Sequence, residues 1–426
     1  MFLSAGFPFM PLLSLYIHIP FCQRKCPYCD FNTYAGLNRL FEPFTDALVH
    51  EIELAGQNAG RPAVRTIFLG GGTPTVLPAG LLQRIMAACR SAFDVLPDAE
   101  ITSEANPGTV DVTRFTALRG LGVNRLSMGV QSFDEAELQF LGRIHSADDV
   151  EAAFVAARAA GFDNINLDLI YGLPNQPHAT WRRTLQRAVD LGPEHISLYS
   201  LTIEDGTPFA DWAAAGRIGI PDPDLAADMY EAADEVLSSA GYVQYEISNW
   251  AKRNEGKTGK MGKEGKKGNK GNAAPSFPSF PSFLSFPSFP SPYPCRHNLT
   301  YWRNEAYLGF GPGAHSSLEG RRWAAIKPVP AYIERVNSGE SVLDFVEETD
   351  KRLAMGETMM LGLRLVHEGV AFERFQQRHG RSMLDVFGDE IADLERMGLL
   401  ERLPDRVRLT RPARLLGNQV FVHFLP

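Results

Sequence analysis

The chain is poor in the features that mark secreted, membrane and nucleic-acid-binding proteins. Only five of its 426 residues are cysteine, an odd and low number that argues against a disulfide framework. No apolar run reaches the length of a transmembrane span. The first 23 residues contain neither Lys nor Arg, so they lack the basic region of a secretory signal and the Arg-rich pattern of a mitochondrial transit peptide. A net charge of −8 gives no sign of general nucleic-acid binding.

Three of the five cysteines stand together near the N-terminus. Cys22, Cys26 and Cys29 have the spacing C-x3-C-x2-C, so their thiolates can converge on one soft metal centre. Three thiolates are one fewer than a structural zinc ion or an ordinary cubane cluster takes from protein. A [4Fe–4S] cluster held by three cysteines leaves one iron open for a ligand, and we favour that interpretation. A zinc site completed by His18 or Cys295 is the alternative.

Apolar, strand-like runs alternate with amphipathic stretches over the first 250 residues. The expected strands are 12–19, 66–69, 100–104, 125–128, 165–169 and 195–199, and the helices between them include 41–55, 81–93, 148–160 and 180–191. Strand then helix, repeated about six times, is typical of a parallel sheet with crossover helices. We therefore predict an α/β fold with a full or partial barrel, in which the cysteine loop follows the first strand and chemistry collects at the strand ends.

Residues 251–292 interrupt this pattern. Eight basic and two acidic residues in 252–270 give a local charge of +6, which leaves −14 for the remainder, and a Pro-Ser-Phe repeat follows at 275–290. Gly, Pro and Lys dominate this segment, so we predict a low-complexity disordered insertion. A solvated linker is the favoured interpretation, and contact with nucleic acid or anionic lipid is the alternative.

The pattern predicts an ordered chain again after the insertion. Helices are expected at 352–365 and 382–397, and a strand at 406–410. These elements indicate a small α/β domain of winged-helix type at the C-terminus. The predicted domains are a barrel domain at 1–250, the insertion at 251–292, a barrel extension at 293–345 and the C-terminal domain at 346–426.

Several other residues carry chemistry at strand ends. The run Gly70-Gly71-Gly72-Thr73-Pro74 follows an expected strand, and its glycines would let a ligand approach the backbone closely, although a tight turn is the alternative. Glu104 ends another strand and can pair with an ammonium group or serve a turn. Asp168 lies in an apolar run and must be hydrogen-bonded, with a ribose hydroxyl as one candidate partner. Arg143 can neutralise a carboxylate in a bidentate manner.

Six motifs together resemble a known family. They are Tyr16-Ile-His-Ile-Pro-Phe-Cys-x3-Cys-Pro-Tyr-Cys29, Gly70-Gly-Gly-Thr-Pro-Thr75, Glu104-Ala-Asn-Pro107, Met128-Gly-Val-Gln-Ser-Phe133, Leu141-Gly-Arg-x-His145 and Asp168-Leu-Ile-Tyr-Gly-Leu-Pro174. They resemble the radical S-adenosylmethionine (SAM) group that contains oxygen-independent coproporphyrinogen III oxidase and its relatives. The resemblance covers nearly the whole chain except 252–294, and it implies a partial (β/α)6 barrel.

The resemblance also implies roles for single residues. The three clustered cysteines would hold a [4Fe–4S] cluster whose open iron binds SAM. The residues that would line the SAM site are Tyr16, Tyr28, Gly71, Gly72, Thr73, Glu104, Gln131, Arg143 and Asp168. Glycine backbone and a carboxylate suit the methionine part of SAM, and the polar side chains suit its ribose and carboxylate.

Two features favour the haem-chaperone (HemW-type) branch of this group. The oxidases have a fourth cysteine two residues after the third, and Phe31 occupies that position here. The branch carries a His-Asn-x-x-Tyr-Trp signature, present as His297, Asn298, Tyr301 and Trp302. An imidazole can ligate haem iron, and aromatic side chains can pack on a porphyrin face. A structural role in a loop covering the barrel is the alternative for His297 and Trp302.

The resemblance thus implies a haem chaperone that binds a [4Fe–4S] cluster, SAM and haem, and that delivers haem to acceptors such as respiratory proteins. We expect no coproporphyrinogen oxidase activity, although that activity is the rival function, and a zinc-binding structural protein is the third. Expected partners include an electron donor such as a flavodoxin or ferredoxin, and a homodimer is one open arrangement. The expected compartment is the cytoplasm, with the mitochondrion or plastid as alternatives.

Overall fold

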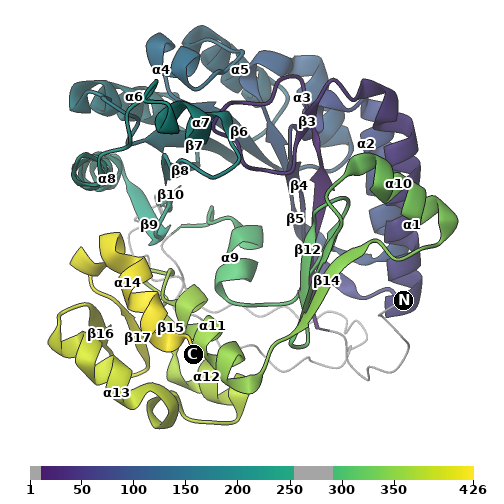
Figure 1. Ribbon diagram of the computed structural model, residues 1–426. Helices are drawn as coiled ribbons and strands as arrows, with labels where there is room; N and C mark the ends of the chain where they lie inside the picture. The colour runs from purple at the N-terminus through teal and green to yellow at the C-terminus, as the bar shows by residue number, and fades with distance from the viewer. Residues whose placement is uncertain (1–10, 254–290) are drawn as a thin grey trace, which may run out of the picture.

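The computed structural model describes residues 11–253 and 291–426, so the predicted insertion lies almost entirely outside the described residues. Six parallel strands form the centre of the fold and alternate with helices along the chain (Figure 1). These strands are β1 (Leu13–Ile19), β4 (Ala63–Gly71), β5 (Asp94–Ala105), β6 (Arg125–Gln131), β7 (Ile165–Tyr171) and β8 (His195–Ser200). The main helices beside them are α1 (Phe41–Ala59), α2 (Ala79–Ala92), α3 (Val112–Gly120), α4 (Glu135–Phe140), α5 (Ala147–Ala159), α6 (His178–Leu191) and α8 (Pro223–Ser239). The predicted partial (β/α)6 barrel is confirmed.

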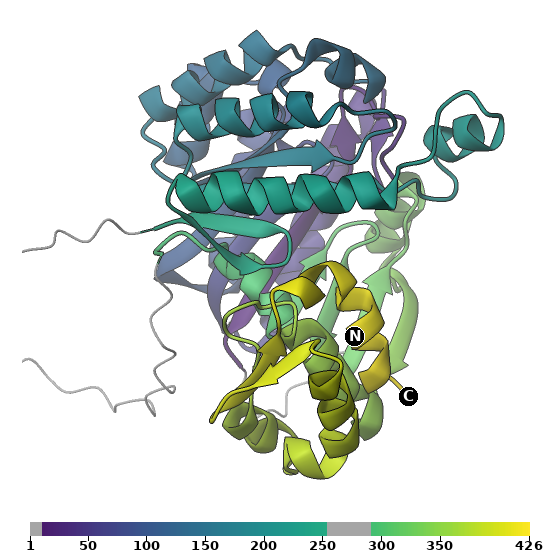
Figure 2. The same cartoon turned by 90° about the vertical axis from the view of Figure 1, so that its left-hand side faces the viewer.

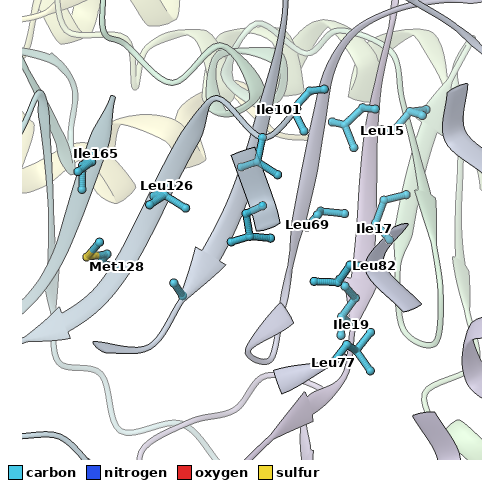
Figure 3. Close-up of a cluster of buried hydrophobic side chains, with 14 of the residues drawn as sticks. Leu15, Ile17, Ile19, Leu69, Leu77, Leu82, Ile101, Leu126, Met128 and Ile165 are labelled. Atoms are coloured by element: carbon cyan, nitrogen blue, oxygen red, sulfur yellow. The ribbon is translucent and has the colours of Figure 1, made fainter. Parts of the chain in front are cut away.

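The period of two along β1 decides which side chains face the helices and which face the barrel interior. Leu13, Leu15, Ile17 and Ile19 are completely buried in the main hydrophobic core. Figure 3 shows Leu15, Ile17 and Ile19 beside apolar side chains of the neighbouring strands, with Leu77 and the α2 residue Leu82 next to them. The alternate residue Tyr16 borders the central cavity instead. A strand buried on both sides therefore carries core residues on one face and site residues on the other.

Further strands extend the parallel sheet at both edges. β10 (Asn249–Lys252) and β9 (Tyr242–Glu246) add antiparallel strands beyond β8. On the other side β11 (Tyr307–Phe310) pairs parallel with β1, and β12 (His315–Leu318), β13 (Arg321–Ala325) and β14 (Leu343–Glu348) follow as antiparallel strands. The strand order is β14-β13-β12-β11-β1-β4-β5-β6-β7-β8-β10-β9. Helix α10 (Val329–Ser338) packs on α1.

The short helix α9 (Arg296–Trp302) lies inside the curve of the sheet (Figure 1). Its Thr300 hydroxyl is 2.9 Å from the Ser14 hydroxyl of β1, and backbone N–H groups at its start donate to the buried carboxylate of Glu100 in β5. The helix therefore contacts the N-terminal ends of strands, opposite the edge that carries the cysteine loop.

A small α/β domain follows the sheet and has its own core (Figure 2). It contains α11 (Lys351–Gly362), β15 (Val370–Ala371), α12 (Phe372–His379), α13 (Met383–Arg396), β16 (Leu400–Arg402), β17 (Arg406–Leu409) and α14 (Gly417–Phe421). Its three strands form an antiparallel sheet in the order β15-β17-β16. Helices beside a small antiparallel sheet agree with the predicted C-terminal α/β domain, whose boundaries stay a prediction.

Ion pairs join this domain to the segment after α9. Arg303 donates to both carboxylate oxygens of Glu368, and Arg374 bridges Glu368 and Glu305. Glu305 also pairs with Arg65 of β4. The C-terminal domain is therefore connected through this network to the helix that reaches into the barrel. No helix among residues 11–253 and 291–426 is long and apolar enough to cross a membrane.

Candidate functional site

The cysteine loop leaves the end of β1 as a compact turn. Cys22 ends the short strand β2 (Phe21–Cys22), which pairs with β3 (Tyr34–Ala35), and the backbone N–H of Cys29 donates to the carbonyl of Cys26 at 3.1 Å. All three thiols are free and half-buried. The three cysteines therefore lie on one loop that follows the first strand, and their role as ligands of a cluster stays a prediction.

The loop is held in place by contacts from distant parts of the chain. The His18 ring binds the carbonyl of Asn32 through Nε2 at 2.9 Å, and the Asn32 amide donates to the carbonyl of Pro312 at 2.8 Å. The backbone N–H of Phe209, in α7 (Pro208–Ala214), donates to the carbonyl of Pro27 at 3.1 Å. His18 therefore serves as an anchor of the loop in this structure.

Polar groups surround the three sulfur atoms. The Thr73 hydroxyl donates to Cys22 Sγ at 3.7 Å, and Arg143 Nη1 donates to Cys26 Sγ at 3.4 Å. Burial raises the pKa of the Cys22 and Cys29 thiols, and hydrogen bonds to their sulfur atoms act in the opposite direction. Three thiols with donors aimed at sulfur match the ligand set of an iron–sulfur cluster. Within the described residues, no group of three His, Cys, Asp or Glu side chains is arranged to hold a single metal ion.

The glycine run forms a close backbone surface at the end of β4. Gly71 has φ of +108°, and a Cβ there would lie 2.5 Å from the His18 ring. A Cβ on Gly72 would lie 2.5 Å from the carbonyl oxygen of Phe21. Only glycine fits these two positions, because a side chain would collide with the start of the cysteine loop. The loop and the glycine run are thereby packed directly against each other.

Glu104 of β5 and Asp168 of β7 form an acidic pair across β6. The Gly71 N–H donates to the Glu104 carboxylate at 3.0 Å. Burial raises the pKa of Glu104 to about 8, and the nearby Asp168 contributes to the shift. Asp168 accepts hydrogen bonds from the Ser127 hydroxyl at 2.9 Å and the Asn166 amide at 2.8 Å, and burial raises its pKa as well. Two buried carboxyl groups of this kind favour a cationic ligand.

Gln131 and Arg143 complete this side of the site. Gln131 has φ of +71°, an uncommon conformation for a residue with a side chain, and the pairing of β6 with β7 is irregular there. Arg143 donates to the Gly129 carbonyl at 2.6 Å, and its Nη1 is 3.5 Å from the Tyr28 hydroxyl. The Nε of Arg143 is buried without a hydrogen-bond partner in the described residues. A guanidinium that borders a cavity and keeps one N–H group unpaired is suited to binding an anionic group.

One cavity of about 620 Å³ joins these elements. All the site residues predicted from the sequence line this cavity, except Thr73 and Trp302. Thr73 lies behind Cys22, to which its hydroxyl donates. Trp302 faces the C-terminal domain, where the Arg364 guanidinium lies 4.3 Å from its ring centroid. The cavity thus brings the cysteine loop and the start of α9 to one space.

His297 is enclosed by hydrogen bonds on both sides of its ring. Nδ1 is 2.8 Å from the Thr66 hydroxyl, and Nε2 is 2.9 Å from the Tyr301 hydroxyl. The ring also packs on Phe68 at a centroid distance of 5.1 Å. Burial, with a contribution from Arg65, lowers the pKa of His297 to about 3, so the imidazole is neutral. A neutral imidazole is the form that ligates metals, but here both nitrogen atoms are engaged.

The other residues near α9 belong to a buried polar network. The Asn298 side chain is a hydrogen-bond partner of Tyr245 and Glu246. Cys295 donates from Sγ to Glu100 at 3.6 Å, and burial raises its pKa to about 12. The thiol of Cys295 is therefore protonated and hydrogen-bonded in this structure.

Sequence reasoning missed several residues that border the cavity. Tyr199, near the end of β8, borders the cavity and is 46% exposed as a residue, and burial of its hydroxyl raises its pKa. The rule that placed Glu104 and Asp168 at strand ends would also have found Tyr199. Other missed residues include Arg24, Lys25 and Phe31 of the cysteine loop and Arg125, Ser127, Asn166, His195 and Ser197 of the strands. No motif in the sequence pointed to the last five.

Comparison with known proteins agrees with this geometry. A model of the radical SAM superfamily matches residues 16–188, and a model of the HemN C-terminal domain matches residues 350–416. The protein named heme chaperone HemW from Bacillus subtilis is 37% identical over 97% of this chain and 99% of its own. The Escherichia coli protein of the same name is 35% identical over 98% and 99%. A mouse relative, radical S-adenosyl methionine domain-containing protein 1, mitochondrial, is 33% identical over 91% and 81%.

The structural comparison supports the fold independently. The solved structure of coproporphyrinogen III oxidase (HemN) from Escherichia coli covers 97% of this chain and 90% of its own, with a TM-score of 0.77 and 24% identity. The fold, the cysteine loop and the domain matches define a radical SAM protein. Within that superfamily the chain belongs to the HemW family, because its relatives of that name match it over nearly the full length of both chains. Membership of the superfamily implies a [4Fe–4S] cluster and SAM.

Proposed function

We propose that this protein is a haem chaperone: it binds haem together with a [4Fe–4S] cluster and SAM, and it delivers haem to acceptors such as respiratory proteins. The observation that carries the proposal is the similarity, at 33–37% identity over nearly the whole chain, to proteins named heme chaperone in several bacteria. The solved oxidase shares only the fold at its level of identity. The chaperone function is therefore favoured over coproporphyrinogen III oxidation.

The chain's own residues fit the two cofactors that the superfamily implies. Cys22, Cys26 and Cys29 would hold the cluster, and Glu104 and the Gly71–Gly72 backbone would receive the amino acid part of SAM. When bound, the cluster supplies one-electron transfer to SAM. Arg143 would neutralise the SAM carboxylate, and the remaining predicted residues would surround the ribose and the rest of the ligand.

His297 is the proposed haem ligand from the α9 motif. Its neutral ring is suited to iron, but the contact between Nε2 and the Tyr301 hydroxyl must open before the nitrogen can bind a metal. Tyr301 and Asn298 would then face the macrocycle from the same helix. Trp302 would act from the side of α9 that contacts the C-terminal domain.

The test is a titration of the reconstituted protein with haemin. Stoichiometric binding with a shifted Soret band is expected, and His297→Ala should alter the band or weaken binding. Tyr301→Phe keeps the aromatic ring but releases Nε2, so it should bind haemin at least as tightly as the wild type. His50→Ala changes an exposed histidine on α1 and serves as the control. Haemin binding that is unchanged in His297→Ala would move the ligand elsewhere, and absence of binding in the wild type would refute the proposed function.

The proposed partners and compartment follow from the same family. An electron donor such as a flavodoxin or ferredoxin would reduce the cluster, and a homodimer is the proposed assembly. The proposed compartment is the cytoplasm. A mitochondrial location is the alternative, since the mouse relative carries that word in its name.

A further inference from the structure

The mouth of the cavity has an unusual surface beside the cysteine loop. Phe31 is 63% exposed and borders the cavity, next to the exposed cations Arg24 and Lys25. Tyr199, on β8, also lines the cavity. A large exposed aromatic side chain next to two cations at a cavity mouth offers both an apolar contact and an anion contact. None of these four side chains has a role in the proposed binding of the cluster or SAM.

The volume of the cavity suggests where haem would lie if SAM is bound at the same time. A volume of about 620 Å³ falls in the range of roughly 300–1,000 Å³ that holds one ligand of drug size. SAM alone is a ligand of that size, and the residues that fit it lie at the strand ends inside the cavity. A flat macrocycle bound at the same time must therefore project through the opening. Residues at the opening would then contact the edge of the macrocycle, which is where a tetrapyrrole carries its carboxylates.

We propose that Arg24 and Lys25 bind the propionate carboxylates of haem, while Phe31 and Tyr199 pack against the adjoining edge of the macrocycle. This inference rests on the proposed haem binding. Guanidinium and ammonium groups are the side chains that best bind carboxylates.

Two carboxylates at the same mouth limit where a dianion can sit. Asp30 lies on the cysteine loop, and Glu204 lies on the segment after β8. The opening as a whole therefore carries both signs of charge. The edge of haem that carries the two propionates would bind on the side of Arg24 and Lys25, away from Glu204. Lys25 already donates to the Phe31 carbonyl at 3.1 Å, which keeps the cation and the aromatic ring on one loop.

The test compares haemin with haemin dimethyl ester, in which both carboxylates are esterified. The wild type should bind the ester roughly three- to thirtyfold more weakly than haemin, since two partly exposed ion pairs are lost. Arg24→Gln/Lys25→Gln should bind haemin as weakly as the wild type binds the ester, and it should not distinguish the two ligands. Arg39→Gln/Arg381→Gln removes the same charge from exposed positions outside the cavity and should behave as the wild type. Cluster absorption and SAM affinity, measured on each variant, should stay unchanged.

The Arg24→Gln single variant keeps the Lys25 contact with the loop and should lose part of the preference for haemin, which Arg24→Lys should restore. Wild-type protein that binds haemin and its ester equally would overturn this inference while leaving the chaperone function intact. A double variant that still prefers haemin by the wild-type factor would also overturn it. Wild-type protein that binds neither ligand would instead refute the proposed function itself.

Discussion

The buried carboxyl group of Glu104 should make SAM binding depend on pH. Its pKa is about 8, because burial disfavours the charged form and Asp168 adds repulsion. At pH 7 roughly one tenth of the molecules therefore have an ionised Glu104 before the ligand binds. The ammonium group of SAM favours the ionised carboxylate and lowers its pKa, so binding releases a proton. Affinity should then rise with pH.

The magnitude follows from the distance between pH and pKa. Below about pH 8 the affinity should rise by up to about tenfold per pH unit, because each unit exposes about ten times more carboxylate. Near pH 8 it should level off and then fall, since an ordinary α-amino group loses its proton at about 7.7–8.0. Glu104→Gln keeps the shape but not the charge. It should bind SAM about ten- to a hundredfold more weakly at pH 8, because one charge-assisted hydrogen bond is worth roughly 1.5–3 kcal/mol.

The assay is equilibrium binding of SAM to anaerobically reconstituted protein between pH 6 and pH 8. Cluster absorption in each sample shows that the cysteines remain loaded. Glu53→Gln, an exposed position on α1, is the matched control and should keep the wild-type slope. A wild-type affinity that is constant over this range, or a Glu104→Gln variant with the same slope and affinity, would show that Glu104 does not pair with the ammonium group of SAM.

Three other changes have defined outcomes. The triple variant Cys22→Ala/Cys26→Ala/Cys29→Ala should lose iron binding and charge-transfer absorption, because no other thiol borders the loop. The EPR signal of the reduced cluster, and its response to SAM, should disappear with them. Arg374→Glu places three like charges together at the junction with the C-terminal domain and should lower the free energy of unfolding by about 1–2 kcal/mol in urea titrations, a value discounted for partial exposure. Glu51 has its pKa raised by burial to about 7, above its unfolded value of about 4.5, so the folded state keeps a proton that the unfolded state loses. Stability of the apoprotein should therefore fall by roughly 2–3 kcal/mol between pH 4.5 and pH 7, and Glu51→Gln should remove that loss.

Each of these predictions has a control and a contradicting result. Cys89→Ala alters a buried thiol in α2 and should keep the cluster, whereas stoichiometric zinc without iron in the wild type would contradict the cluster assignment. Arg396→Glu reverses an exposed charge on α13 and should change stability less than Arg374→Glu does. A wild-type stability that rises steadily from pH 5 to pH 7, with no difference in the Glu51→Gln variant, would show that this carboxyl group is ionised in the folded state.

The barrel could be predicted from sequence because its strands are buried on both faces. The expected strand 12–19 corresponds to β1, Leu13–Ile19, whose alternate residues are all core residues. The expected strand 100–104 was too short, since β5 begins at Asp94. The first half of β5 includes Pro97 and several exposed residues, so it lacks the apolar pattern that marks a strand. Pairing with β4 makes that half a strand, and pairing cannot be read from a single segment.

The site could be predicted where a local rule applied. Glu104 and Asp168 lie on β5 and β7 of one parallel sheet, so the expectation that both face the same site follows from the topology of alternating strands and helices. The enclosure of His297 could not be predicted, because its partner Thr66 lies 231 residues earlier in the chain. The contact of Trp302 with Arg364 likewise depends on how the C-terminal domain meets α9. Contacts between segments far apart in sequence decide these environments, and no local pattern encodes them.

The most direct test of the central claim measures haem binding and oxidase chemistry on the same preparation. Anaerobically reconstituted protein is incubated with SAM, a reductant and coproporphyrinogen III, and protoporphyrinogen is assayed, while a second portion is titrated with haemin. We expect stoichiometric haemin binding and no protoporphyrinogen. Robust formation of protoporphyrinogen would contradict this expectation and identify the protein as an oxidase.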